Sequence, residues 1–192
     1  MTLRCFFAIE LTTDWRRTLE DAKTVILDLD PSWREARWIR PENLHITLAF
    51  MPKVPDEDVG QLLARTADAL SDAEPFDLRL AGVKAVPRTA RARMIWARAE
   101  SDPDMQSVVR RLERSVAEYA GDNTGRAFRP HVTLCRARNP APVSPDAVLA
   151  ASRLVESASR PVSVSYVTLF KSTLGPGGPT YDALGTVPLG VD

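Results

Sequence analysis

The sequence lacks the features typical of disulfide-stabilised proteins, of transmembrane proteins and of proteins that bind long nucleic-acid duplexes. Cys5 and Cys135 are its only cysteines and are far apart, which suits a reducing compartment better than a disulfide framework. Its 25 basic residues are balanced by 25 acidic residues, so no broad positive field is available for long nucleic-acid duplexes. No stretch reaches the roughly 18 apolar residues of a membrane span. We therefore expect a cytoplasmic protein without a membrane or long-duplex partner.

The 192 residues, 44% of them hydrophobic and 26% charged, suit an ordinary globular chain with one domain or two small lobes. Strand and helix patterns alternate along it, which predicts an α+β fold. We expect strands at residues 3–11, 43–50, 76–86, 94–99, 128–137, 163–173 and 181–189. We expect helices at residues 13–30, 56–70, 105–119 and 146–157, with Thr13 capping the first, Gly121 capping the third, and Pro52 and Pro55 breaking the chain before the second.

The two histidines of the chain lie in a repeated tetrapeptide. One copy is His45-Ile46-Thr47-Leu48 and the other is His131-Val132-Thr133-Leu134, 86 residues later (131 − 45). Side chains alternate along a strand, so each histidine shares a face with its threonine while the intervening apolar residues point into a core. The repeat predicts an imperfect internal duplication whose two polar faces line one cleft.

Two imidazoles in one cleft suit the opening of a cyclic phosphodiester. The attacking water must lose a proton while the leaving ribose oxygen gains one on the opposite side of phosphorus. With an ordinary pKa near 6.5, one imidazole can be neutral and the other protonated near neutral pH. The hydroxyls of Thr47 and Thr133 could stabilise the phosphate oxygens. This chemistry needs neither a metal nor another cofactor, and we expect none.

The histidines and Cys135 also allow other interpretations. A single histidine on a strand is more often structural than catalytic, but here both histidines follow one pattern in opposite halves of the chain. Cys135 shares the strand parity of His131, which makes a His-Cys metal site conceivable. The close HxH or CxxC pairs that would support such a site are missing.

The sequence resembles the two-histidine phosphoesterases of the LigT type, in particular the RNA 2′,3′-cyclic phosphodiesterases or 2′-5′ RNA ligases. The likeness covers nearly the whole chain, through RCFFAIEL, WIRPENLHITLAF, RARMIWARAE, FRPHVTLCRA and VTLFKSTLGPGGPTYDAL. It implies one bilobal domain over residues 1–192, with two antiparallel sheets facing each other across a central cleft and helices outside. It also implies that His45 is the proton donor and His131 the acceptor. Met51-Pro52 replaces the Leu-Gly common after the first motif, so the shape of that loop is open.

Further residues are candidates for substrate binding. Arg129 and Arg136 flank the second motif and suit phosphate oxygens, while the resemblance points to Ser172 and Tyr181. The remaining basic residues near these segments we interpret as surface charges: Arg40, Arg91, Arg93, Arg126 and Lys171. Trp38 and Phe128 could stack a base, but we expect them in the core.

The function that these features favour is hydrolysis of 2′,3′-cyclic phosphate ends of RNA to 2′-phosphates by a monomer, with 2′-5′ ligation as an additional activity that the resemblance allows. A related phosphoesterase would act on small cyclic nucleotides, ADP-ribose cyclic phosphate or 2′-5′ oligoadenylate. A third hypothesis is a non-catalytic module that binds RNA ends. The absence of a basic stripe favours a small or terminal substrate, and the intact paired motifs disfavour a mere binder.

Overall fold

The computed structural model describes residues 1–100, 102–121, 127–176 and 178–190 and confirms the α+β fold. Its strands are β1 (Thr2–Glu10), β2 (Arg37–Trp38), β3 (His45–Pro55), β4 (Phe76–Leu78), β5 (Leu80–Val86), β6 (Ala92–Ala99), β7 (His131–Ala141), β8 (Val162–Val164), β9 (Tyr166–Gly175) and β10 (Gly178–Pro188). Its α-helices are α1 (Thr13–Leu29), α2 (Val59–Leu70), α3 (Pro103–Ser115) and α4 (Pro145–Ala158).

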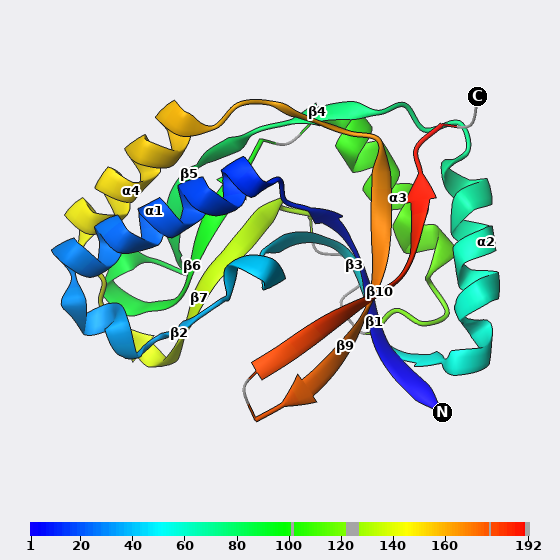
Figure 1. The fold of residues 1–192 in the computed structure, drawn as a ribbon, viewed down its shortest axis with the longest axis horizontal. Helices are drawn as coiled ribbons and strands as arrows, with labels where there is room; N and C mark the ends of the chain where they lie inside the picture. Colours follow the sequence, from blue (N-terminus) through cyan, green and yellow to red (C-terminus); the bar gives the residue numbers. More distant parts are fainter. Residues whose placement is uncertain (101, 122–126, 177, 191–192) are drawn as a thin grey trace.

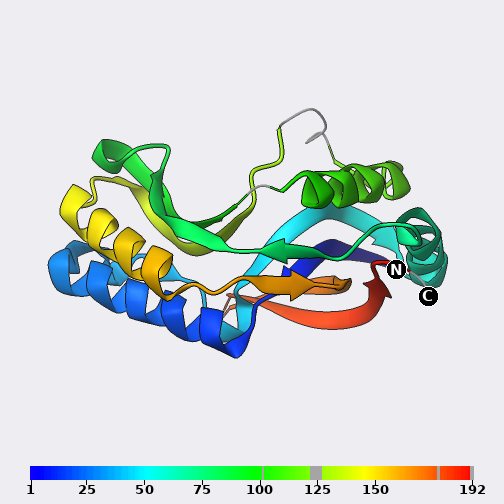
Figure 2. The same cartoon turned by 90° about the horizontal axis from the view of Figure 1, so that it is seen from above.

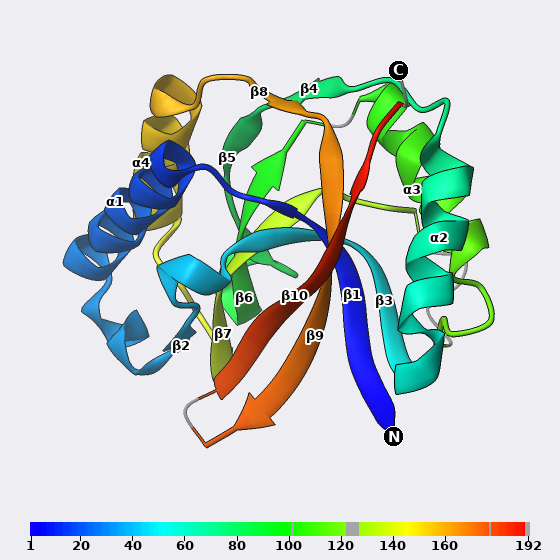
Figure 3. The same cartoon turned by 45° about the vertical axis from the view of Figure 1, so that its right-hand side comes forward.

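The strands form two lobes of antiparallel sheet. One lobe has the order β10-β9-β1-β3 and the other the order β7-β6-β5, with β2 added to β7 (Figures 1 and 3). The lobes belong to one hydrogen-bonded sheet because β3 pairs with β7 at a single position, Ile46 with Val132. Strands β4 and β8 form a separate two-stranded sheet. The two histidine strands therefore meet at the junction of the lobes.

The helices cover the outside of the molecule in two pairs. Helices α1 and α4 pack together at the end of the molecule that holds β5, while α2 and α3 pack together at the other end, against β10 and β3 respectively (Figure 2). Helix α1 follows β1 in the chain and α3 follows β6, yet each lies in the opposite lobe from the strand that precedes it. Each lobe is thus built from both halves of the sequence.

Helix ends differ in places from the sequence expectation. Thr12, one residue before the predicted cap, accepts a hydrogen bond from the backbone N–H of Trp15. Helix α3 ends at Ser115, although apolar residues at helical spacing continue to Tyr119. At Val116 the backbone leaves the helical conformation, and the Tyr119 hydroxyl donates to a carboxylate oxygen of Asp58 at 2.8 Å. The apolar residues after Ser115 therefore pack in the turn that follows the helix and do not extend it.

The expected break at Pro52 is wrong, because β3 continues to Pro55. Strand β1 pairs with β3 from His45 to Met51 and again at Val54 and Pro55, and Pro52 lies in the register shift between them. Strand β7 pairs with β3 only at Ile46, so the other edge of β3 is unpaired near Pro52. A proline at an unpaired edge removes no hydrogen bond from the sheet.

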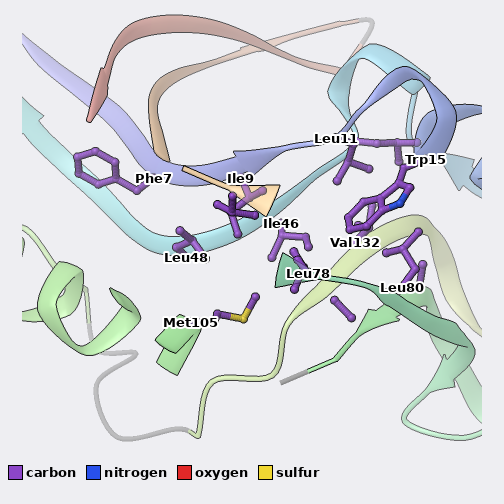
Figure 4. Packing of buried hydrophobic residues seen from close by; sticks show 14 of the residues in the cluster. Phe7, Ile9, Leu11, Trp15, Ile46, Leu48, Leu78, Leu80, Met105 and Val132 are labelled. Carbon is purple, nitrogen blue, oxygen red and sulfur yellow. The ribbon is translucent and has the colours of Figure 1, made fainter. Parts of the chain in front are cut away.

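A continuous apolar core lies behind the histidine strands (Figure 4). Ile46 and Val132, the middle residues of the two motifs, are fully buried within it, as are Phe7 and Met105. The expected alternation is confirmed at these positions, since the residues between the histidines and threonines face the core. None of the helices in the described ranges has both the length and the hydrophobicity of a membrane span.

Candidate active site

The two motifs line a single pocket of about 330 Å³ at the junction of the lobes. His45 and Thr47 reach it from β3, and His131 and Thr133 reach it from β7. All four side chains are partly buried. The structure thus brings together the four residues that the sequence singled out for acid and base chemistry.

Both histidines are held in the same way by their own backbone. The carbonyl oxygen of Asn43 lies 2.7 Å from Nδ1 of His45, and that of Arg129 lies 2.7 Å from Nδ1 of His131. A carbonyl only accepts, so Nδ1 carries the hydrogen in both rings and Nε2 is the nitrogen left for proton transfer. Each anchor is the residue two positions before the histidine, a symmetry that the tetrapeptides alone do not show.

Aromatic rings fix the planes of the imidazoles. Phe6 stacks on His45 with 4.7 Å between ring centroids, and Trp96 stacks on His131 at 3.7 Å. Tyr181 meets His45 edge-on at 5.2 Å. These contacts restrict rotation of each ring and exclude water from one of its faces.

Burial is the main influence on both histidines. It lowers the pKa of His45 below its ordinary value, against the opposing hydrogen bond to Asn43, and the charges of His131 and Arg136 lower it further. Burial also lowers the pKa of His131, as does Arg136, while the hydrogen bond to Arg129 opposes this. Without a bound anion, both rings therefore favour the neutral form near pH 7.

A β-bulge follows the threonine in both motifs. The pairing register skips Leu48 in β3 and Leu134 in β7, so the residue after each leucine also turns into the core. As a result Cys135 is fully buried on the core side. It does not share a face with His131, so the two residues cannot form the His-Cys metal site considered above. No three histidine, cysteine or acidic residues of the described chain are grouped so as to hold a metal ion.

The same bulges bring one more side chain from each strand into the pocket. Phe50 lies five residues after His45 and Arg136 five residues after His131, and both line the pocket. Strict alternation places these residues on the opposite face. Arg136, which was predicted to bind substrate, therefore reaches the pocket only because of the bulge. Arg136 donates from Nη1 to the sulfur of Met94 at 3.0 Å.

Three arginines line the pocket: Arg4, Arg37 and Arg136. The guanidinium of Arg4 also lies over the ring of Phe50, 4.5 Å from its centroid. None of the three forms an ion pair within the part of the chain that the structure describes. The sequence did not single out Arg4 or Arg37, because single arginines on a short strand or a strand edge resemble ordinary surface charges.

The other candidates are distributed between the pocket and its surroundings. Ser172 and Tyr181, paired across β9 and β10, both line the pocket. The side chain of Arg129 is exposed and does not line it; its carbonyl is what serves His131. Trp38 and Phe128 pack against the core, as expected. Arg126 lies outside the described residues.

Comparison with known proteins places this arrangement in a family context. A family model described as the 2′-5′ RNA ligase superfamily matches residues 13–175. A protein of Thermus thermophilus named RNA 2′,3′-cyclic phosphodiesterase is 29% identical, covering 95% of this chain and 88% of its own. One of the same name from Methanothermobacter thermautotrophicus is 28% identical, with coverage of 94% and 96%.

Solved structures agree with the fold. A crystal structure of a Thermus thermophilus protein superposes with a TM-score of 0.78 at 27% identity, covering 97% of this chain and 98% of its own. The crystal structure of E. coli LigT complexed with 3′-AMP has a TM-score of 0.72 at 22% identity and full coverage of both chains. The second likeness concerns the fold alone.

Proposed function

The chain belongs to the 2′-5′ RNA ligase superfamily, and from this premise we propose that it is an RNA 2′,3′-cyclic phosphodiesterase, a hydrolase that converts 2′,3′-cyclic phosphate ends into 2′-phosphates. The observation that carries the proposal is the paired geometry of His45 and His131. Two imidazoles from matching strands line one pocket, and each has its Nδ1 occupied by a backbone carbonyl. Both therefore present Nε2 for proton transfer.

In the proposed reaction the cyclic phosphate lies between the two rings. His131 accepts a proton from water as the water oxygen attacks phosphorus, the bond from phosphorus to the 3′ oxygen breaks, and His45 gives its proton to that oxygen. The hydroxyls of Thr47 and Thr133 donate to the non-bridging oxygens, where negative charge grows. The positive charge of Arg136 stabilises the same oxygens.

The substrate phosphate also favours the protonated histidine that the mechanism requires and that the free site lacks. Burial keeps both histidines neutral near pH 7, whereas the mechanism requires one of them to be protonated. A phosphodiester anion in the pocket favours the charged form of a neighbouring imidazole and raises its pKa. Substrate binding thus helps to set the protonation state in which the pair works.

The proposal extends to the wider character of the protein. The two lobes act as a single domain, because the pocket needs a histidine from each of them. The protein acts on RNA ends as a monomer in the cytoplasm. Its two buried, unpaired cysteines are compatible with the reducing conditions of that compartment. Light scattering of the purified chain tests the monomer, since a dimer would have twice the 21.2 kDa mass of one chain.

The test of the reaction is a turnover assay with a substrate panel. The panel holds adenosine 2′,3′-cyclic phosphate, an RNA oligonucleotide with a 2′,3′-cyclic end, ADP-ribose 1″,2″-cyclic phosphate and 2′-5′ diadenylate, each with wild type and with the His45→Ala/His131→Ala variant. We expect turnover of the cyclic RNA end by wild type alone. Binding without turnover of any substrate would instead indicate a non-catalytic module.

Two readouts of the same assay test the mechanism. Separation of the products against authentic adenosine 2′- and 3′-monophosphates should show the 2′ isomer, because His45 protonates the 3′ oxygen; a 3′ product would refute the donor assignment. Turnover should also persist after exhaustive EDTA treatment. Loss in EDTA with rescue by zinc or manganese would show that the reaction needs a metal.

A further inference from the structure

A second pocket lies beside the first and is lined by residues of β6 and β7. It has a volume of about 280 Å³ and is lined by Arg93, Met94, Arg136, Ala137, Arg138 and Pro140. Arg136 also lines the first pocket, so the two pockets share one guanidinium group. Anions held in the two pockets would therefore lie on either side of a common cation.

The arginines of this pocket lack carboxylate partners. The arginines that form ion pairs in the described chain are Arg40, Arg65 and Arg111, and most of the other described arginines form none, so what distinguishes this pocket is the gathering of three such groups. Arg93 and Arg138 have neither an ion pair nor a hydrogen bond within the described ranges, and Arg136 donates only to a methionine sulfur. Three guanidinium groups gathered around one concavity without counter-charges, in a chain of zero net charge, create a local positive potential that favours an anion.

The lining also indicates which part of a nucleotide would bind. The first pocket contains aromatic rings, Phe6, Phe50 and Tyr181, which offer stacking and apolar surface to a nucleoside. The second contains no aromatic ring, and its neutral members are small or flexible apolar residues. A guanidinium group suits phosphate oxygens, and a pocket without an aromatic ring offers no platform on which a base could stack.

We propose that this second pocket binds the phosphate on the 5′ oxygen of the same nucleoside whose 2′,3′-cyclic phosphate occupies the first pocket. In an RNA chain this is the phosphodiester that links the terminal nucleotide to its neighbour. The inference rests on the proposed function for the identity of the first ligand. It makes a nucleotide with a 5′ phosphate, and an RNA end in particular, a better substrate than a bare cyclic nucleoside phosphate.

The test measures binding separately from turnover. Calorimetry compares adenosine 2′-monophosphate with adenosine 2′,5′-bisphosphate, for wild type and for Arg93→Gln/Arg138→Gln. Charge-assisted hydrogen bonds of the usual strength predict that wild type binds the bisphosphate about tenfold more tightly and that the variant loses this preference. Affinity for the monophosphate should not change, because neither arginine lines the first pocket.

A matched control removes the same two charges elsewhere. Arg17→Gln/Arg153→Gln lies on the exposed surfaces of α1 and α4 and should keep the preference for the bisphosphate. An equal loss in both double variants would show that net charge alone is responsible and would overturn the subsite. Equal binding of the two ligands by wild type would also overturn it.

Turnover distinguishes the two sources of a 5′ phosphate. The substrates are adenosine 2′,3′-cyclic phosphate, its 5′-phosphorylated form and a dinucleotide with a cyclic end. A gain in kcat/KM shared by the last two supports recognition of the phosphate itself, and a larger gain for the dinucleotide supports an RNA chain as its source. If no substrate is turned over, the proposed hydrolysis fails, whereas the calorimetric preference still decides on the subsite.

Discussion

At the scale of single residues, the two histidines differ in what surrounds Nε2, although their Nδ1 anchors match. Nε2 of His45 lies 3.0 Å from the hydroxyl oxygen of Thr47. A hydroxyl can donate to a neutral imidazole and accept from a protonated one, so this contact is compatible with a ring that changes its charge. Nε2 of His131 makes no such contact in the described chain, which suits the proton acceptor role proposed for it.

Substitution of the histidines tests whether they act as a pair. His45→Ala and His131→Ala should each lower turnover of a cyclic phosphate by about 100-fold or more, because each removes one proton transfer. The double variant should be far less than multiplicatively worse, since the second histidine contributes little once the first is gone. Rates are compared after circular dichroism confirms folding. A folded single variant with near wild-type turnover would refute the pairing.

Arg136 should set the pH range of activity. Its charge lowers the pKa of both histidines, so Arg136→Gln should raise both values and move the acidic limb of kcat/KM to higher pH. The bell-shaped profile of wild type should have that limb below pH 6.5, where the lowered pKa values lie. The same change should reduce kcat/KM about tenfold or more, through lost stabilisation of phosphate.

Arg129→Gln is the matched control for that experiment. The carbonyl of residue 129 holds His131, and substitution of the exposed side chain leaves this hydrogen bond intact. The pH profile of Arg129→Gln should therefore follow wild type. A shift equal to that of Arg136→Gln would show that general surface charge sets the profile.

At the scale of elements, the sequence predicts the strands and helices well where periodicity is strong. It could also predict that Ile46 and Val132 are buried, because alternation holds over each tetrapeptide. It could not predict the bulges after Thr47 and Thr133, since an extra residue in a strand leaves no mark in an apolar run. For this reason the prediction that Cys135 shares a strand face with His131 was wrong, and nothing in the sequence indicated that Phe50 enters the pocket.

The burial of both cysteines has a chemical consequence. Burial raises the pKa of the Cys5 thiol to about 11 and that of Cys135 to about 12. Only the thiolate reacts with disulfide reagents, so neither thiol of the native protein should react with Ellman's reagent at pH 8. After unfolding in guanidinium, both should react. A thiol that reacts rapidly in the native protein, and is protected by adenosine 2′-monophosphate, would place a cysteine in the pocket.

At the scale of the whole molecule, the duplication extends beyond the histidine motifs. Phe76 in β4 and Val162 in β8 are also 86 residues apart, and these two strands pair with each other. The joining residues Ile46 and Val132 are separated by the same interval. The tetrapeptides could predict the repeat. They could not predict that the lobes exchange helices, because the contacts of α1 with α4 connect residues that no local pattern relates.

The junction of the lobes can be tested with two isoleucines of equal burial. Ile46→Ala, at the junction, and Ile26→Ala, on α1, should each lower the free energy of unfolding by about 2–5 kcal/mol, because both side chains are fully buried. Only Ile46→Ala should also lower kcat, by about tenfold or more, since it disturbs the spacing of the histidines. Urea unfolding and turnover measure the two effects. Equal kcat values for the two variants would argue against a special junction.

The single backbone pair between Ile46 and Val132 joins β3 to β7 directly beside both histidines. If the lobes flex about this pair, it acts as a fulcrum, and displacement grows with distance from it. His45 and His131 are the immediate chain neighbours of the fulcrum, whereas Arg4 and Arg138 stand far along their strands. Flexing of this kind would widen the mouth for substrate entry and product departure while the gap between the two imidazoles stayed nearly constant.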